Sequence, residues 1–172
     1  MNNEQIRNIL SELVSSENED RWWRTDLFRK YTFSQIPSEL KIIDFPPEEE
    51  KNYNCFLYAL GLQNDQRFLG NAGWEFTRNL GTTFEAMIDK KILTISLSPE
   101  KGDMILYRAN DGSISHVGLV DGQNTVISKW SWGPIIKHSI FDVPKEYGDV
   151  VEYYKASKEA RDYVIEEYIR SL

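Results

Sequence analysis

The sequence contains one side chain that can act as a strong nucleophile near neutral pH, the thiol of Cys55, which is the only cysteine of the chain. It lies in NYNCFLYALG (residues 52–61), where polar sequence gives way to an apolar run with helical spacing. Backbone N–H groups at the start of a helix favour a thiolate and can also bind an oxyanion. The alternative is a buried cysteine that packs as a small hydrophobic residue beside Phe56 and Leu57, a common role of free cysteines.

Only two histidines, His116 and His138, could serve as the base that such a thiol needs. His116 opens HVGLVD (residues 116–121), directly after turn-rich sequence, so we expect its imidazole at the start of a strand and at the edge of the sheet. The alternative for His116 is a hydrogen-bonded structural histidine. His138 lies in the alternating run IIKHSIF (residues 135–141), where it either faces solvent or orients His116.

The order of these motifs resembles that of the NlpC-type and CHAP cysteine amidohydrolases and peptidases, a superfamily of papain-like fold. EKGD (residues 100–103) is a variant of the Pro-Gly-Asp turn that leads one strand in these families, and HVG (residues 116–118) begins the next. DGQNTVIS (residues 121–128) matches the turn and strand that follow. Upstream, NCFLYA (residues 54–59) matches the CHAP pattern of a polar residue, Cys, two variable residues and Tyr-Ala. The resemblance covers residues 52–143 in segments.

The resemblance implies a role for each matching residue. Cys55 would be the nucleophile, His116 the general base and acid, and Asn54 a contributor to the oxyanion hole. These families place His, Asn, Gln or Glu on the strand after the histidine strand, where it orients the base. This chain departs from that pattern, because the corresponding strand offers Ser128, Lys129 and Ser131. Ser128 falls at the third-residue position in one alignment, and His138 lies one strand later. Ser128 and His138 are the candidates for the third catalytic position.

Two tryptophans, Trp130 and Trp132, flank a serine in SKWSWG (residues 128–133) and could form a wall for a substrate chain. Aromatic residues on strands are more often core or cross-strand partners. We expect Trp22 and Trp23 in the N-terminal region to pack against the fold.

Other kinds of site have little support. A structural zinc site needs four ligands, which one cysteine and two histidines do not supply without carboxylates. No glycine motif for a phosphate or a dinucleotide is present. We therefore expect neither a metal nor a cofactor.

The N-terminal half is predicted to be mainly helical. Apolar residues from Ile6 to Val14 recur with helical spacing behind a cap at Asn2 or Asn3, and a second helix starts near Asn18. The paired prolines of DFPPEEE (residues 44–50) exclude a helix there. The predicted Cys55 helix runs to about residue 60, and Gly61 is its stop signal. TTFEAMIDK (residues 82–90) forms a further short helix.

From residue 91 on, short β-branched or aromatic runs alternate with turn signals, which indicates an antiparallel meander. The runs are KILTISL, DMILYR, HVGLVD, TVISKW and PIIKHSIF, with YGDVVEYY (residues 147–154) as a closing strand. SKEARDYVIEEYIRSL returns to helical spacing. Together these patterns predict an α+β fold in a single domain, residues 1–172. Its predicted parts are a helical N-terminal extension (1–45), a papain-like core (50–154) and a C-terminal helix (155–172).

The composition excludes several partners. The 172 residues carry a net charge of −7, so the chain lacks the basic field that general binders of nucleic acids or anionic membranes need. No window approaches the roughly 20 apolar residues of a membrane span, and the N-terminus has no signal-peptide pattern. We expect a cytoplasmic protein; export without a cleaved signal is the alternative.

These observations predict a thiol-dependent amide hydrolase, a peptidase or amidase with a Cys-His dyad or triad. Its substrate would be a peptide or a peptidoglycan-like amide, and stem peptides are the commonest substrates that the resemblance implies. Intracellular peptides, isopeptides and side-chain amides are further options. The main alternative is an inactive papain-like domain that binds a protein partner. A plain globular protein with Cys55 in its core is the third possibility.

Overall fold

A computed structural model of the chain describes residues 1–70, 73–155 and 157–172. A seven-stranded antiparallel sheet occupies its centre, with the strand order β1-β6-β5-β4-β3-β7-β2. The strands are β1 (Lys41–Asp44), β2 (Thr94–Ile95), β3 (Met104–Arg108), β4 (Ile114–Gly122), β5 (Thr125–Lys129), β6 (Ile135–Ser139) and β7 (Val150–Lys155). β3, β4, β5 and β6 form the predicted meander, because they pair in sequence order. The prediction is wrong for its first run, KILTISL (residues 91–97), which contributes only β2, and β2 pairs with β7 rather than with β3.

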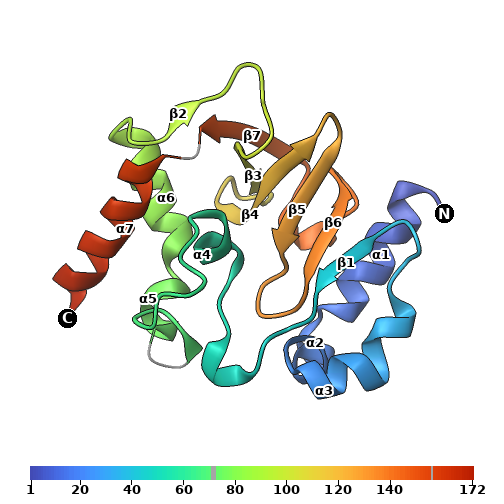
Figure 1. Cartoon of the computed structure of the whole chain (residues 1–172). Helices are drawn as coiled ribbons and strands as arrows, with labels where there is room; N and C mark the ends of the chain where they lie inside the picture. Colours follow the sequence, from blue (N-terminus) through green and yellow to red (C-terminus); the bar gives the residue numbers. More distant parts are fainter. Residues whose placement is uncertain (71–72, 156) are drawn as a thin grey trace.

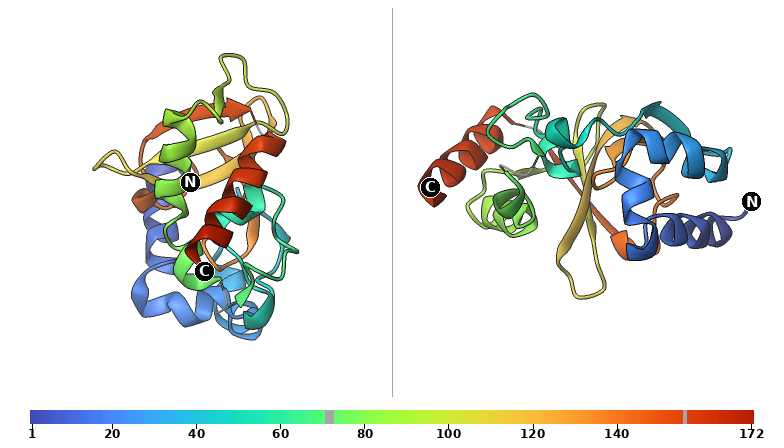
Figure 2. Two further views of the ribbon diagram at one scale, coloured as in Figure 1. Left: turned by 90° about the vertical axis from the view of Figure 1, so that its left-hand side faces the viewer. Right: turned by 90° about the horizontal axis from the view of Figure 1, so that it is seen from below.

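Helices cover both faces of the sheet, as Figures 1 and 2 show, and the fold is of the predicted α+β class. The α-helices are α1 (Asn3–Leu13), α2 (Glu19–Trp23), α3 (Thr25–Leu27), α4 (Cys55–Ala59), α5 (Trp74–Thr77), α6 (Leu80–Asp89) and α7 (Lys158–Ser171). Helices α4 to α7 lie on one side of the sheet and α1 to α3 on the other (Figure 1). None of the helices in the described parts of the chain is long and apolar enough to cross a membrane.

The sheet separates two hydrophobic cores. The first core lies on the side of α4 and includes Cys55, Leu57, Phe84, Val117 and Val164. The second lies on the side of α1 and α2 and includes Leu10, Trp22, Tyr107, Val126 and Trp130. Because successive residues of a strand point to opposite faces, β3, β4 and β7 each contribute to both cores.

Local sequence signals explain where several helices begin and end. The side chain of Asn2 accepts a hydrogen bond from the backbone of Gln5, and the side chain of Gln5 accepts one from Asn2, which forms a capping box for α1. The chain after α4 turns away at Gly61, whose φ of +68° favours glycine, as predicted. The predicted short helix at residues 82–90 corresponds to α6.

The prediction of a wholly helical segment 1–45 is wrong at its end, because β1 pairs with β6 at the edge of the sheet. Strand β1 has only two apolar residues between charged ones, which gave the sequence no clear alternation. The second helix begins after Asn18 as expected, but α2 ends at Trp23 because Arg24 is extended (φ −86°, ψ 123°). Two short turns of helix, η2 (Phe28–Thr32) and η3 (Phe33–Gln35), follow α3.

Candidate functional site

Cys55 is the first residue of α4, which packs against both β4 and β5. Asn54 is the N-cap, and its side-chain oxygen accepts a hydrogen bond from the backbone N–H of Leu57 at 3.2 Å. The Asn54 side-chain nitrogen donates to the backbone oxygen of Thr77 at 2.9 Å. Both polar atoms of the Asn54 side chain are therefore bonded within the fold, and in this conformation Asn54 fixes the start of the cysteine helix.

The thiol of Cys55 is buried, with only 4% of the residue exposed. Burial raises the pKa of this thiol to about 11, although the backbone N–H groups of Val117 and Phe56 and the charge of Lys129 act in the opposite direction. The thiol is thus protonated near neutral pH in this conformation. The groups that would stabilise a thiolate already surround it.

His116 lies in the interior of β4, two residues after the strand begins at Ile114, so its predicted place at a strand start and sheet edge is wrong. The residue is completely buried, and neither ring nitrogen has a hydrogen-bond partner in the described parts of the chain. Its ring stacks on Tyr147, with centroids 4.0 Å apart and an interplanar angle of 11°. Burial, followed by the charge of His138, holds the pKa of His116 well below its usual value.

The two proposed partners of the dyad lie close along the backbone but point into different cores. Cys55 contacts the N–H of Val117, the residue after His116, and both Cys55 and Val117 belong to the first core. The His116 ring packs against Tyr107 and Tyr147, which belong to the second core. The hydrogen bond typical of a Cys-His dyad is not formed in this conformation.

Packing between two strands explains why residue 118, the third of the HVG motif, is a glycine. A Cβ atom at this position would lie 2.5 Å from Val126 Cγ1 and 3.1 Å from Ser128 Cβ, both on the neighbouring strand β5. Only a residue without a side chain lets β4 and β5 approach this closely. The glycine therefore brings the strand that carries His116 and the strand that carries Ser128 together.

Ser128 and His138, the two candidates for the third catalytic position, contact each other. His138 is only 2% exposed, so the expectation that it could face solvent is wrong. The Ser128 hydroxyl and His138 Nε2 are 2.8 Å apart, while His138 Nδ1 lies 2.8 Å from the backbone oxygen of Ser139. That oxygen can only accept, so Nδ1 carries the proton and Nε2 accepts from the hydroxyl. Trp130 Nε1 donates to the same hydroxyl at 2.8 Å, which completes a chain of bonds that does not include His116.

Lys129, at the end of β5, is a site residue for which the sequence pattern predicted no role. It is completely buried, and its ammonium group donates to Asn52 Oδ1 at 3.0 Å and to the backbone oxygens of Ser131 and Gly133. Its charge acts on the thiol of Cys55. A lysine at the end of an alternating strand gives no sign of burial, because the pattern does not show what covers that position.

The two tryptophans of SKWSWG have different environments. Trp130 is completely buried, and its ring stacks on Trp22 with centroids 6.0 Å apart. Trp132 is half-buried and meets Trp23 edge to face, with centroids 6.4 Å apart. Trp22 and Trp23 thus pack against the fold as predicted. In this conformation only Trp132 lies where it could form part of a substrate wall.

A cavity of about 740 Å³ lies between α2 and α3 on one side and the acidic segment before α4 on the other. It is lined by Trp23, Arg24, Thr25, Asp26, Arg29, Pro47, Glu48, Glu49 and Glu50. The cavity presents charges of both signs, and its acidic wall continues into the segment that leads to Cys55. In the cavity and in the rest of the described residues, no three His, Cys, Asp or Glu side chains gather closely enough to hold a metal ion.

Comparison with known proteins gives one result. The curated proteins and the solved structures contain no match to this chain. Residues 45–155, which begin directly after β1 and run from the segment before α4 to the end of β7, match the family model of a domain of unknown function, DUF7689. Since this match covers more than half of the sequence, the chain belongs to the DUF7689 family.

Proposed function

We propose that the protein is a thiol-dependent amide hydrolase of papain-like fold, with Cys55 as its nucleophile. One observation carries the proposal: the thiol lies at the start of α4 against the N–H groups of Phe56 and Val117 and near the charge of Lys129. Backbone N–H groups and a nearby cation are the features that activate cysteine nucleophiles.

In the proposed reaction the Cys55 sulfur forms a bond to the substrate carbonyl carbon, and the carbon–nitrogen bond of the amide breaks. His116 first takes the thiol proton and then gives it to the leaving amine. Water hydrolyses the resulting thioester and restores the thiol. The N–H groups at the start of α4 would stabilise the oxyanion.

The buried state of the site makes this structure a resting form. The thiol pKa of about 11 and the contact between His116 and Tyr147 both oppose catalysis. An active form requires the imidazole to leave Tyr147 and turn toward the side of Val117. Binding of a substrate near Trp132 could supply the free energy for this change, because induced closure or opening commonly assembles catalytic groups.

The cavity between α2, α3 and residues 47–50 is the proposed binding place for the substrate chain. Arg24 and Arg29 line one side, and Glu48, Glu49 and Glu50 line the other. Such a surface suits a peptide that carries both ammonium and carboxylate groups, as peptidoglycan stem peptides do.

The experiment is a search for newly released amines after incubation with a mixed peptide library and with purified peptidoglycan. We expect hydrolysis by the unaltered protein, loss of at least 100-fold in Cys55→Ala, and a similar loss in His116→Gln. Trp23→Leu serves as a probe of the cavity and should weaken substrate binding more than it lowers kcat. Hydrolysis that survives in Cys55→Ala would refute the proposed nucleophile.

The second candidate is a binding domain of the same fold without catalysis. The observation that favours it is the burial of both Cys55 and His116, which leaves no open thiol in the resting form. If the library is not cleaved, and specific peptides are retained equally by the unaltered protein and Cys55→Ala, this second function is the correct one.

A further inference from the structure

Lys129 is an unusual residue because a fully buried ammonium group has no carboxylate beside it. Its three hydrogen bonds go to Asn52 Oδ1, Ser131 O and Gly133 O, all of which are uncharged. No ion pair joins Lys129 to an Asp or Glu within the portion of the chain that the structure describes. Buried lysines usually have such a partner, since an isolated charge in the interior is costly.

The hydrogen bonds themselves indicate the charged form of Lys129. Carbonyl oxygens can only accept, and three of them surround the nitrogen. An ammonium group has three N–H donors, whereas a neutral amine has two and would direct its lone pair at the third oxygen. The nitrogen also lies 5.1 Å from the centre of the Tyr53 ring, an arrangement that attracts a cation. Burial holds the pKa of Lys129 well below its usual value, and the negative charges of Cys55 and Asp44 act in the opposite direction.

The bonds of Lys129 reach the segment that carries Cys55. Asn52, which accepts from the ammonium group, also donates from its side-chain nitrogen to the backbone oxygen of Trp132 at 2.8 Å. Lys129 therefore links the turn after β5, where Ser131 has a positive φ of 51°, to the residues just before α4. This link fixes the start of the cysteine helix against the sheet.

Cys55 is the group near Lys129 that can become negative. Continuing the β4–β5 register from the pair Leu119–Ile127 places Lys129 opposite Val117. The thiol contacts the N–H of that same Val117, and the charges of Cys55 and Lys129 act on each other. Asp44 is the other group whose negative charge acts on Lys129.

We propose that Lys129 is a positioning residue of the thiol site, whose ammonium group holds the segment before α4 and is the counter-ion of the Cys55 thiolate. This deepens the proposed function, since it assigns a cation to the same nucleophile. When Cys55 ionises, its electron pair stays on sulfur and its proton passes to another base. Lys129 cannot take that proton, because all its nitrogen valences are already occupied.

The test uses the single cysteine of the chain and needs no substrate. The rate of alkylation of Cys55 by uncharged iodoacetamide is measured from pH 7.5 to 9 in the unaltered protein and in Lys129→Met. The matched control is Lys137→Met, which removes a half-exposed lysine on β6 that pairs with Asp121 at 2.6 Å. Below the thiol pKa the rate follows the thiolate fraction, so each unit of pKa changes it tenfold.

We expect the rate in Lys129→Met to fall at least tenfold at every pH, because a nearby opposite charge lowers a pKa by about 1–3 units. The rate in Lys137→Met should stay within twofold of the unaltered protein. An unchanged or faster rate in Lys129→Met would overturn the proposal, since a purely structural lysine would leave the site looser and more reactive.

A second measurement covers the case in which Lys129→Met does not fold. The 13Cε chemical shift of Lys129 in the unaltered protein at pH 8 distinguishes an ammonium group from a neutral amine. An ammonium group supports the proposal, and a neutral amine overturns it. Both readouts concern the free protein, so a failure to find hydrolysis would refute the proposed function and leave the counter-ion assignment to be judged separately.

Discussion

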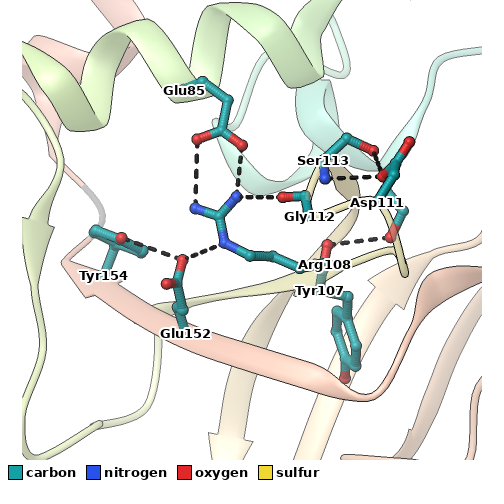
Figure 3. A network of polar contacts seen from close by, with 9 residues as sticks. Glu85, Tyr107, Arg108, Asp111, Gly112, Ser113, Glu152 and Tyr154 are labelled. Atoms are coloured by element: carbon teal, nitrogen blue, oxygen red, sulfur yellow. Dashed lines mark hydrogen bonds and ion pairs between the residues drawn. The ribbon is translucent and has the colours of Figure 1, made fainter.

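Two polar groups on adjacent strands, Arg108 on β3 and His116 on β4, are treated in opposite ways by the fold. The guanidinium group of Arg108 makes four hydrogen bonds: two to Glu85 of α6, one to Glu152 of β7 and one to the backbone oxygen of Gly112 (Figure 3). His116, more deeply buried, makes none through its ring within the described residues.

The difference separates a structural polar group from a candidate functional one. Arg108 ties a helix, a strand and a turn together, and each of its bonds has an evident mechanical role. Buried polar atoms in native proteins nearly always have a partner, so an unpaired imidazole requires an explanation. The explanation that fits the proposed hydrolase is that His116 is kept unpaired for a partner that arrives with the active conformation.

The largest expected effect is a loss of folding stability in acid, caused by the two buried histidines, His138 and His116. Burial lowers the pKa of His138 to about 4, whereas the unfolded chain has the ordinary value of 6.5. Between these values the unfolded state binds the extra proton, so the free energy of unfolding falls as the pH falls. His138 alone should remove about 3 kcal/mol by pH 4, and His116 acts in the same direction.

Urea unfolding at pH 7, 5.5 and 4.5 measures this loss. His138→Gln, which retains a group able to bond Ser128, should make the dependence on pH clearly shallower. A free energy of unfolding that stays constant between pH 6.5 and 4.5 would show that the histidines are not buried as described, and the comparison with Arg108 would lose its basis.

The next largest effect on stability is expected at Arg108, whose side chain is hydrogen-bonded to Glu85 and Glu152. Arg108→Met should lower the free energy of unfolding by about 2 kcal/mol, because hydrogen bonds between charged groups are lost and Glu85 and Glu152 keep part of their hydration. The side chains of Arg108, Glu85 and Glu152 are 19%, 38% and 34% exposed, which limits the loss.

The matched control is Arg170→Met, because Arg170 also contacts two glutamates but its side chain is 62% exposed. Thermal or urea unfolding should show a change below about 0.5 kcal/mol for this variant. Equal losses in the two variants would mean that the Arg108 network is no stronger than a surface ion pair.

The same contrast shows what the sequence could predict of the fold. Strong local patterns identified α1, α4, α6 and the strands of the meander, because helical spacing and alternation arise from burial of one face. The place of β7 between β3 and β2, and the addition of β1 beside β6, could not be predicted. Strand pairing over long separations depends on packing of the whole chain rather than on local sequence.

Of the candidate site, the position of Cys55 at a helix start followed from the sequence, since an N-cap asparagine before an apolar run is a local signal. The burial of Lys129 and His138 did not follow. Alternation assigns a residue to one face of a strand, but the covering of that face comes from elements distant in sequence, such as Asn52 for Lys129.

The smallest expected effect on stability, and the most informative, is that of His116→Phe. The phenyl ring can keep the stack on Tyr147, and two buried polar atoms without partners are removed. Replacing an unpaired polar group by an apolar one of similar shape is neutral or stabilising, so the free energy of unfolding should stay equal or rise by about 1 kcal/mol. The decisive comparison is the sign of the change in the free energy of unfolding, which should be negative in Arg108→Met but zero or positive in His116→Phe. Urea unfolding at pH 7 measures both changes.

Amide hydrolysis by His116→Phe, measured on the same preparation, should disappear while the free energy of unfolding is kept or raised. Such a pair of results is the signature of a residue retained for function at a cost in stability. A loss of more than about 1 kcal/mol in His116→Phe would instead mean that the imidazole is bonded in the folded protein, in the way that the guanidinium of Arg108 is. His116 would then be a second structural polar group, and the binding domain without catalysis would become the better account of the site.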